Sequence, residues 1–269
     1  MALNTRIVES DFTVDPLENY ELIGDEHEFY KREGWLLLPS LLKDSAVDAV
    51  KQDVLDVLAA LGKKTSELHR AEDVSHKLLQ TSQYLPRSPL DQLINSERLN
   101  GLANSLLGGD CSLYQPFTAV KSGGGGGEFH FHQDNNYTRF ENGMHGINIW
   151  FALVDMTPEN GCLCIEPRSH LGGTVASENV GQGDHHRKVA VEPSYHLPVR
   201  MRAGDAVAFS RLTVHGSGPN VSGQPRIGYS VQFHRNDARA SWDDHSPRLL
   251  TSERRWRVGP VGSIEVGAD

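Results

Sequence analysis

The sequence lacks the features that would place a chain in a membrane or in an oxidising compartment. No apolar run in its 269 residues approaches the roughly 18 to 20 residues needed to cross a bilayer. Residues 1–20 contain four acidic side chains and no apolar stretch of signal-peptide type. The three cysteines, Cys111, Cys162 and Cys164, are too few for a disulfide framework and form no Cys-x-x-Cys site. These absences predict a cytoplasmic protein with buried thiols and no membrane partner.

Clusters of basic residues are also missing. The net charge is -9 at pH 7, and no run of five or more Lys and Arg occurs. Because nucleic-acid phosphates require clustered positive charge, this composition argues against a nucleic-acid partner. A chain of this length can bury a sizeable core as one unit, so we predict a single domain over residues 1–269, either monomeric or homodimeric.

The first part of the chain is patterned for helices. Apolar residues from 47 to 61 recur at helical spacing after Asp44, and Gly62 follows as a stop signal. A short helix through residue 32 is predicted with Asp25 as its cap, and a further helix from Pro89 to Gly108 continues or restarts at Ser96. Residues 34–39 form a buried strand, and residues 1–24 a loosely docked arm. Residues 1–110 are therefore predicted to be a mostly helical support region.

The pattern changes at Cys111 to short apolar runs separated by Gly, Asn, Pro and Asp, which is typical of a β-sandwich or barrel. Strands are predicted over residues 112–121, 129–134, 146–154, 162–166, 195–200, 206–210 and 226–234. Between them, residues 171–194 form a polar insertion. A β-rich core over residues 111–236 is thus followed by a charged C-terminal tail, residues 237–269, that packs on the outside or reaches a neighbour.

One short segment carries the strongest chemical signal. Five consecutive glycines, Gly123 to Gly127, precede the run Phe129-His-Phe-His-Gln-Asp134. Side chains alternate between the faces of a strand, so His132 and Asp134 should project to the same side. An imidazole and a carboxylate are two of the three ligands of the facial triad that holds non-haem Fe(II). The segment therefore predicts part of a metal site, which needs a second histidine from elsewhere.

His215 is the candidate for this second histidine. It is predicted to end an apolar strand, because Gly-Ser-Gly-Pro-Asn follows it as a strong turn signal. Eleven residues later, Arg226 opens another apolar strand, and a guanidinium can hold a carboxylate with two charge-assisted hydrogen bonds. The order His-x-Asp, distal His, then Arg resembles the Fe(II)/2-oxoglutarate-dependent oxygenases. Within them it resembles most the phytanoyl-CoA dioxygenase family.

The resemblance covers the block from Phe131 to Gly173, including Asn160-Gly-Cys-Leu163 and Pro167-Arg-Ser-His170. The family usually has Pro-Gly-Ser-His at the last motif, so Arg168 stands where a glycine is expected. The resemblance implies a mainly β fold with a helical N-terminal part, built on a double-stranded β-helix, the jelly-roll or cupin-like core. It also implies that His132, Asp134 and His215 are the metal ligands and catalytic centre.

The resemblance further implies the co-substrates. Fe(II) and 2-oxoglutarate would react with O2 to hydroxylate an unactivated C–H of a small molecule, with succinate and CO2 as co-products. Arg226 would bind the distal carboxylate of 2-oxoglutarate, and Lys121 and Trp150 match family positions that line the same site. Alternatively, Lys121 is a surface residue at a strand end and Trp150 is simple core. Because Asp134 is present, hydroxylation, desaturation or ring closure is favoured over halogenation.

The prime substrate is less closely defined. The candidate substrate residues are polar and lie near the predicted ligands: Asn136, Arg139, Asn148 and Arg168. Such groups suit a compact polar metabolite better than a long acyl chain. An anionic group on that metabolite, bound by Arg139 or Arg168, is a further expectation. In the alternative, the two arginines pair with acidic neighbours such as Glu141 and Glu166.

A protein of another class stays possible on the same residues. A metal-free jelly-roll protein could bind a small molecule at this site without any chemistry. Two further histidines, His69 and His76, could face a substrate pocket, and the loop Asp184-His-His-Arg187 could bind metal, although solvated loops are the favoured interpretation of both. Cys162 and Cys164 share a strand face, so a metal role for that pair is a minor alternative.

Overall fold

The computed structural model describes residues 15–62, 78–79, 81–125, 127–180, 186–191, 193–241, 246–250 and 259–260. The predictions for His69, His76, Asp184 and His185, and for most of the N-terminal arm, lie outside these ranges. Among the described residues, no helix is both long enough and apolar enough to span a membrane.

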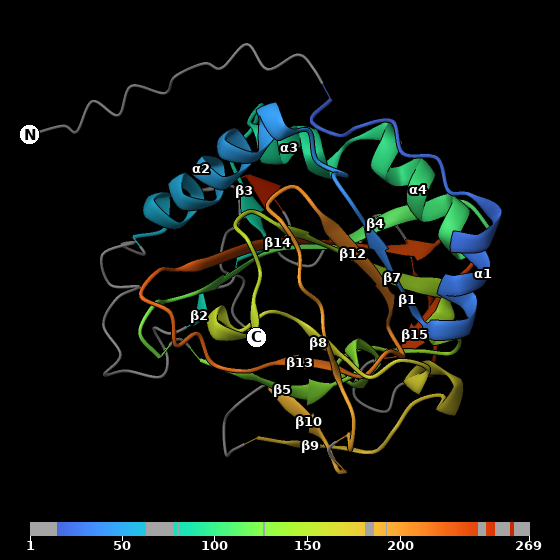
Figure 1. Cartoon of the computed structure of the whole chain (residues 1–269). Coiled ribbons are helices and arrows are strands. Elements are labelled where there is room, and N and C mark those ends of the chain that lie inside the picture. The colour runs from blue at the N-terminus through green and yellow to red at the C-terminus, as the bar shows by residue number, and fades with distance from the viewer. Residues whose placement is uncertain are drawn as a thin grey trace, which may run out of the picture.

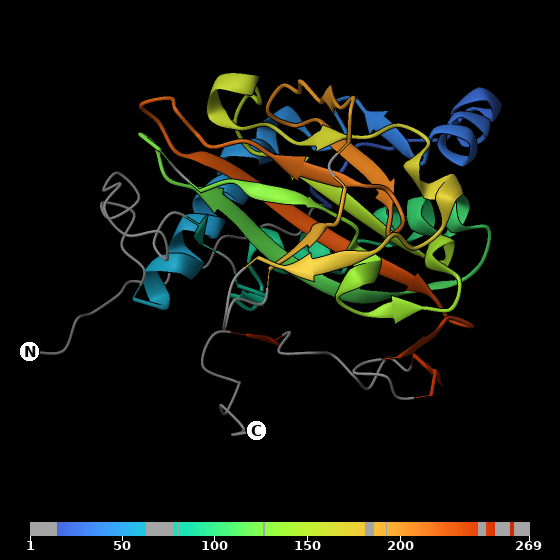
Figure 2. The same ribbon diagram turned by 90° about the horizontal axis from the view of Figure 1, so that it is seen from below.

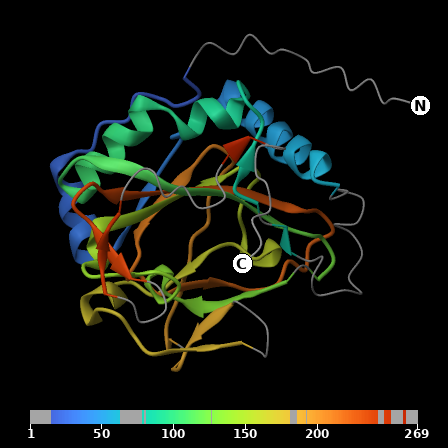
Figure 3. The same ribbon diagram turned by 180° about the vertical axis from the view of Figure 1, so that it is seen from behind.

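Helices from the first part of the chain cover one face of the main sheet (Figures 1 and 3). They are α1 (Gly24–Glu33), α2 (Asp44–Ala60), α3 (Pro89–Ile94) and α4 (Glu97–Leu107). In α2 the residues Val50, Val54 and Leu58, four apart, are fully buried, as expected for an amphipathic helix lying on a core.

The helix boundaries confirm the predicted restart at Ser96 and correct one cap. The Ser96 hydroxyl accepts a hydrogen bond from the Leu99 amide at 3.3 Å, so a new helix begins there. The predicted cap Asp25 instead lies inside α1, whose N-cap is Ile23. The Glu26 carboxylate accepts from the Ile23 amide at 3.0 Å and supplies the bond that a capping side chain would make.

Two antiparallel sheets face each other and form the predicted jelly-roll core, with the minor sheet on the side away from the helices (Figure 1). The main sheet runs in the order β1 (Trp35–Leu38), β12 (Ala206–Ser210), β7 (Gly146–Ala152), β14 (Arg226–Arg235), β4 (Cys111–Lys121) and β2 (Leu78–Leu79). The minor sheet runs β11 (Leu197–Pro198), β8 (Cys164–Ile165), β13 (His215–Ser217) and β5 (Phe129–His132). The N-terminal part therefore contributes a strand, β1, as well as the helical layer.

Small sheets and 3-10 turns complete the described chain. Two of the sheets are pairs: β9 (Ser177–Asn179) with β10 (Arg187–Val189), and β3 (Gln83–Tyr84) with β17 (Gly259–Pro260). The third has three strands, in which β15 (Arg239–Ser241) lies between β6 (Arg139–Phe140) and β16 (Arg248–Leu249). The turns are η3 (Asp134–Asn136), η4 (Gly143–His145), η5 (Pro158–Asn160) and η6 (Ser169–Gly172). The insertion predicted to be a polar loop thus contains the pair β9 and β10, and β10 packs beside β5 at the minor sheet (Figure 2).

Alternation along β7 separates two apolar clusters. Ile147, Ile149 and Phe151 belong to the cluster that the helices cover, whereas Trp150 belongs to a cluster between the two sheets. Asn148 shares the Trp150 face of the strand, as the strand period of two requires. The functional side chains of β7 consequently point into the space between the sheets.

Two predicted strand ends are wrong at the residues that matter most. The strand predicted to reach Asp134 ends at His132, because the Asn136 side chain accepts from the Gln133 amide at 3.2 Å and starts a 3-10 turn. His215 begins β13 instead of ending a strand. The preceding strand stops at Ser210, whose hydroxyl accepts from the Leu212 amide at 3.2 Å. Strands β8 and β11 are also shorter than predicted.

Candidate active site

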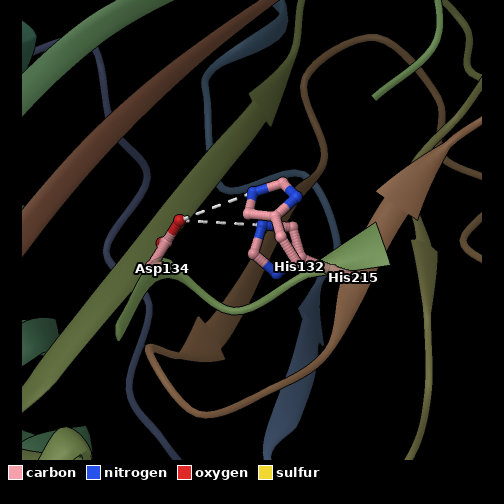
Figure 4. A group of neighbouring side chains, drawn as sticks. All are labelled: His132, Asp134 and His215. Atoms are coloured by element: carbon pink, nitrogen blue, oxygen red, sulfur yellow. Dashed lines mark ion pairs between the residues drawn. The ribbon is translucent and has the colours of Figure 1, made fainter. Parts of the chain in front are cut away.

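Three side chains from β5, η3 and β13 converge on one point (Figure 4). His132 and His215 are opposite each other in the antiparallel pair of β5 and β13. The Asp134 Oδ1 atom is 3.9 Å from His132 Nε2 and 3.8 Å from His215 Nε2. The three ligand atoms all lie within 4.8 Å of one another, and the residues are 5 to 8% exposed. One metal ion could contact all three.

Backbone carbonyls fix the tautomer of both histidines. His132 Nδ1 lies 2.7 Å from the carbonyl oxygen of His130, and His215 Nδ1 lies 2.9 Å from that of Thr213. A carbonyl only accepts, so each Nδ1 must donate its proton, and Nε2 is the nitrogen left to face a metal ion. Burial, followed by the neighbouring His215, lowers the pKa of His132 to about 4. His132 is therefore in the neutral form that a metal ion requires.

The carboxylate of Asp134 is oriented by two amides. Its Oδ2 atom accepts from the side chains of Asn148 at 3.4 Å and Gln232 at 3.2 Å, which leaves Oδ1 facing the histidines. The Ser230 hydroxyl donates to Asn148 Oδ1 at 2.7 Å and so fixes the orientation of that amide. Burial opposes ionisation of Asp134, but His215 and then Arg211 outweigh it and hold its pKa below the ordinary value. The ligand is thus an ionised carboxylate.

The three ligand residues lie in the wall of a pocket of about 450 Å³ between the two sheets. The strand β14 spans its length, with Arg226 near one end and Gln232 six residues further on. We call these the Arg226 end and the Gln232 end. Of the lining residues, Ala119 accepts from Arg226 and Trp150 lies beside it, so both belong to the Arg226 end. Gln115 is opposite Gln232 in register and is bonded to Ser82, so these two belong to the Gln232 end.

Two buried basic residues are neighbours at the Arg226 end. Arg226 on β14 pairs in register with Lys121 on β4, and the residues are 2% and 0% exposed. The Arg226 guanidinium donates to the carbonyls of Gly161 at 3.0 Å and Ala119 at 3.3 Å, while its Nε has no partner in the described part of the chain. Within that part, no carboxylate pairs with either side chain. A buried guanidinium with unused donors fits one carboxylate group of a dicarboxylic acid.

The structure places Lys121 behind the pocket wall. Its ammonium donates to the Ser217 hydroxyl at 2.7 Å and to the carbonyls of Ser217 and Gly218. Burial, followed by Arg226, lowers the pKa of Lys121 to about 6. Ser217 itself lines the pocket and was missed in the sequence, although it lies two residues after His215 and so on the same strand face.

The Trp150 side chain forms part of the wall beneath Arg226. Its ring lies 5.2 Å from the Arg226 guanidinium, a cation–π distance. The ring fits because residue 228 is glycine: a Cβ there would come within 2.2 Å of the indole. Gly228 is a second residue that the sequence did not single out, since its role depends on the pairing of β14 with β7.

Of the four predicted substrate residues, only Asn148 lines the pocket. Asn136 donates to the Val175 carbonyl at 3.0 Å, and Arg139 is exposed on β6. Arg168 is also exposed and has a φ of 67°, the left-handed conformation that favours glycine. The backbone at this position is left-handed, which explains why the family usually has glycine there, and Arg168 adopts the same conformation. The suggested partner Glu141 pairs with Arg239, at 3.2 Å, instead of Arg139.

Comparison with known proteins identifies the family of this chain. The profile of the phytanoyl-CoA dioxygenase (PhyH) family matches residues 30–228, and the chain belongs to that family. Ectoine dioxygenase from Halomonas elongata is 27% identical over 264 residues, which cover 87% of this chain and 77% of that protein. L-proline trans-4-hydroxylase from Streptomyces griseoviridis is 29% identical, covering 77% of this chain and 84% of that protein.

A solved structure shares the fold. The non-heme alpha ketoglutarate dependent carbocyclase SnoK from nogalamycin biosynthesis superposes with a TM-score of 0.69 at 22% identity. The superposition covers 88% of this chain and 96% of that protein. At this identity the likeness supports the jelly-roll fold alone.

Proposed function

We propose that this chain is an Fe(II)- and 2-oxoglutarate-dependent dioxygenase that hydroxylates a C–H of a compact polar metabolite. The observation that carries the proposal is the convergence of His132 Nε2, His215 Nε2 and one oxygen of Asp134 in a buried pocket. Two imidazoles and one carboxylate are the donor set of the facial triad, which leaves coordination positions open for co-substrates. The residues therefore fit iron.

Each part of the pocket has a distinct role in this proposal. Bound Fe(II) and 2-oxoglutarate supply the oxidising chemistry, with succinate and CO2 as co-products. His132, Asp134 and His215 hold the metal, and Arg226 binds the distal carboxylate of 2-oxoglutarate against the Trp150 ring. Lys121 stabilises Ser217 from behind. The burial of all three ligands limits the access of water to the reacting centre.

Pocket size and lining support a compact polar substrate. A volume of about 450 Å³ lies toward the lower end of the ~300 to 1,000 Å³ of small-molecule sites, and it must hold 2-oxoglutarate as well. The Gln232 end is lined largely by hydroxyl and amide groups. Two relatives are named ectoine dioxygenase and L-proline trans-4-hydroxylase, and these names also support a compact polar substrate. Arg139 and Arg168 lie outside the pocket, so the proposal does not require an anionic group.

The test is a substrate panel. Amino acids, cyclic amino acids, phosphonates, amino sugars and acyl-CoA esters would be incubated with protein, Fe(II), 2-oxoglutarate and O2, and succinate measured. We expect at least one compact polar compound to stimulate succinate formation, and Asp134→Ala to abolish the stimulation. Stimulation by long-chain acyl-CoA alone would contradict the substrate class. Absence of iron by elemental analysis, with no succinate from any compound, would favour the metal-free binding protein.

The remaining features belong to the same proposal. The pairing of β1, from the N-terminal part, with β12 of the core supports a single domain over residues 1–269. A reducing, cytoplasmic location suits Cys111 and Cys162, which are buried and free. Whether the protein is a monomer or a homodimer stays a prediction for sedimentation analysis.

A further inference from the structure

Arg211 is a buried cation to which the proposed chemistry assigns no role. It lies in the turn between β12 and β13 and is 3% exposed. Its guanidinium lies over two aromatic rings, 4.3 Å from the centre of Phe140 and 5.0 Å from that of Tyr114. In the described part of the chain it forms no ion pair. Because burial of an unpaired charge is costly, the hydrogen bonds it makes must account for its place.

Those hydrogen bonds all converge on Asp134 and the turn after it. Arg211 donates to the main-chain carbonyl of Asp134 at 2.8 Å and to that of Thr138 at 3.3 Å. The first of these bonds fixes the backbone of the residue that supplies the carboxylate ligand. The second fixes the chain four residues further on, so the turn is clamped at both ends.

A third bond reaches the Asp134 side chain through Gln232. Arg211 donates to Gln232 Oε1 at 3.3 Å, and Gln232 Nε2 donates to Asp134 Oδ2 at 3.2 Å. An amide can be turned either way, but a guanidinium has only donors and must face the oxygen. The NH₂ group of Gln232 is thereby directed to the carboxylate. Arg211 therefore fixes Asp134 twice, directly at its backbone and indirectly at its side chain.

Gly146 lies against the Arg211 side chain and leaves room for it because it has no Cβ atom. A Cβ on Gly146 would lie 2.3 Å from Arg211 Cδ and 3.0 Å from the Phe140 ring. Gly146 has a φ of -138°, which any residue adopts. An alanine at residue 146 would therefore clash with these side chains but would not strain its own backbone.

We infer that Arg211 is a positioning residue of the metal site: it sets the orientation of the Asp134 carboxylate and through it the affinity for Fe(II). The inference rests on the proposed function, since it takes the three-residue cluster to be the iron site. Residues that orient a metal ligand through hydrogen bonds typically change metal affinity by about 10- to 100-fold when they are replaced. Arg211 has the geometry of such a residue on both sides of Asp134.

The experiment is an anaerobic Fe(II) titration of the apoprotein in the presence of 2-oxoglutarate, followed by the visible band of the complex. We expect Arg211→Met to weaken Fe(II) binding by about 10- to 100-fold. Arg211→Lys should not restore it, because a single ammonium cannot span the three acceptors that the planar fork reaches. Gly146→Ala, which displaces Arg211 but removes no donor, should weaken binding in the same direction.

Asp53→Ala is the matched control for lost stability. Asp53 is buried and accepts from the Leu90 amide at 2.8 Å, in the helical layer. We expect it to lower the thermal stability and leave the Fe(II) affinity unchanged. If Arg211→Met does not fold, Gln232→Met removes only the indirect link and should still weaken Fe(II) binding.

Two outcomes are separable. Wild-type Fe(II) affinity in Arg211→Lys, or in both Gly146→Ala and Gln232→Met, would overturn the role of Arg211 while the iron site stands. Failure of the wild-type protein itself to bind Fe(II) would instead remove the proposed function.

Discussion

The two ends of the pocket differ in the side chains that line them. At the Arg226 end, the Arg226 guanidinium lies beside the Trp150 ring, Lys121 is buried on the adjacent central strand, and no described carboxylate pairs with either. At the Gln232 end the lining includes the neutral side chains of Gln115 and Gln232. Arg211 also lines the pocket there, and its guanidinium donates to Gln232 and to the main-chain carbonyls of Asp134 and Thr138. One end is thus suited to a fixed anion and the other to a polar molecule held by hydroxyls and amides. Changes at the two ends should affect different ligands.

The largest expected effect is at the Arg226 end. Arg226→Ala should weaken 2-oxoglutarate binding by about one to two orders of magnitude, because a hydrogen bond to a charged group contributes about 1.5 to 3 kcal/mol. Fe(II) affinity should change little, since Arg226 contacts none of the three ligands. Calorimetric titration of both ligands measures this, with the exposed Arg239→Ala as control. An equal loss of both affinities would show that Arg226 is structural.

A smaller effect on a different ligand is expected at the Gln232 end. Gln115 lines the pocket and donates to the Ser82 hydroxyl at 2.9 Å. Gln115→Ala should raise the KM for the prime substrate by about 2- to 10-fold, since a neutral hydrogen bond contributes about 0.5 to 1.5 kcal/mol. The KM for 2-oxoglutarate should be unchanged. If the two KM values rose together, the ends would not be separate sites.

Lys121 should make the stability of the protein depend on pH, which tests the burial of basic groups at the Arg226 end. In the folded apoprotein its pKa is lowered to about 6 by burial and then by Arg226, against 10.5 for an ordinary lysine. Between these values the unfolded chain binds a proton that the folded chain does not, so stability should rise with pH across this window. Lys121→Met should remove that part of the rise, which urea unfolding at several pH values measures. The same slope in both proteins would mean that the folded-state pKa is not lowered.

The effect of Lys121 on 2-oxoglutarate should be smaller than that of Arg226. Its ammonium lies behind the wall and acts on the pocket through Ser217. Lys121→Met should therefore weaken 2-oxoglutarate binding less than Arg226→Ala does, in the same titration. If Lys121→Met left the 2-oxoglutarate affinity unchanged, Lys121 would have no role in binding this co-substrate.

The smallest expected effect is at Arg168, outside both ends. A left-handed conformation costs an L-residue about 1 to 2 kcal/mol, and glycine avoids this cost. Glycine also has more conformational freedom in the unfolded chain, which offsets about half of the stability gained by the replacement. Arg168→Gly should raise the free energy of unfolding by up to about 1 kcal/mol, while Arg168→Ala, which keeps a Cβ, should not. Chemical denaturation measures the difference. Loss of substrate-stimulated succinate formation in Arg168→Gly would show that the side chain does reach the substrate.

Strand periodicity correctly predicted where several candidate side chains lie, while their roles stay predictions. Asn148 and Trp150 face the pocket because side chains alternate along β7, and Arg226 and Lys121 meet because β14 and β4 pair in register. His132 and Asp134 still turn to the same point, although a 3-10 turn replaces the end of the predicted strand. The spacing rule therefore gave the correct neighbours with an incorrect local structure.

Residues placed by distant contacts could not be predicted in this way. Thr81 reaches the pocket because its amide and carbonyl bond to Thr118, at 3.0 and 2.9 Å, and no local pattern indicates that docking. Asn136 and Arg139 follow the metal ligands in sequence, but the Asn136 side chain turns to the Val175 carbonyl and Arg139 is exposed on β6. Tyr137 and Thr138, which lie between them, line the pocket instead. The role of Gly228 depends on the Trp150 ring, which comes from another strand.

The most direct test of the account is the anaerobic addition of Fe(II) and 2-oxoglutarate to the purified protein. We predict that the wild type develops the weak visible charge-transfer band of the iron chelate, and that His132→Ala and Asp134→Ala do not. Arg226→Ala should show the band only at higher 2-oxoglutarate concentration. No band from folded wild-type protein at saturating Fe(II) and 2-oxoglutarate would contradict the assignment of His132, Asp134 and His215 as an iron site.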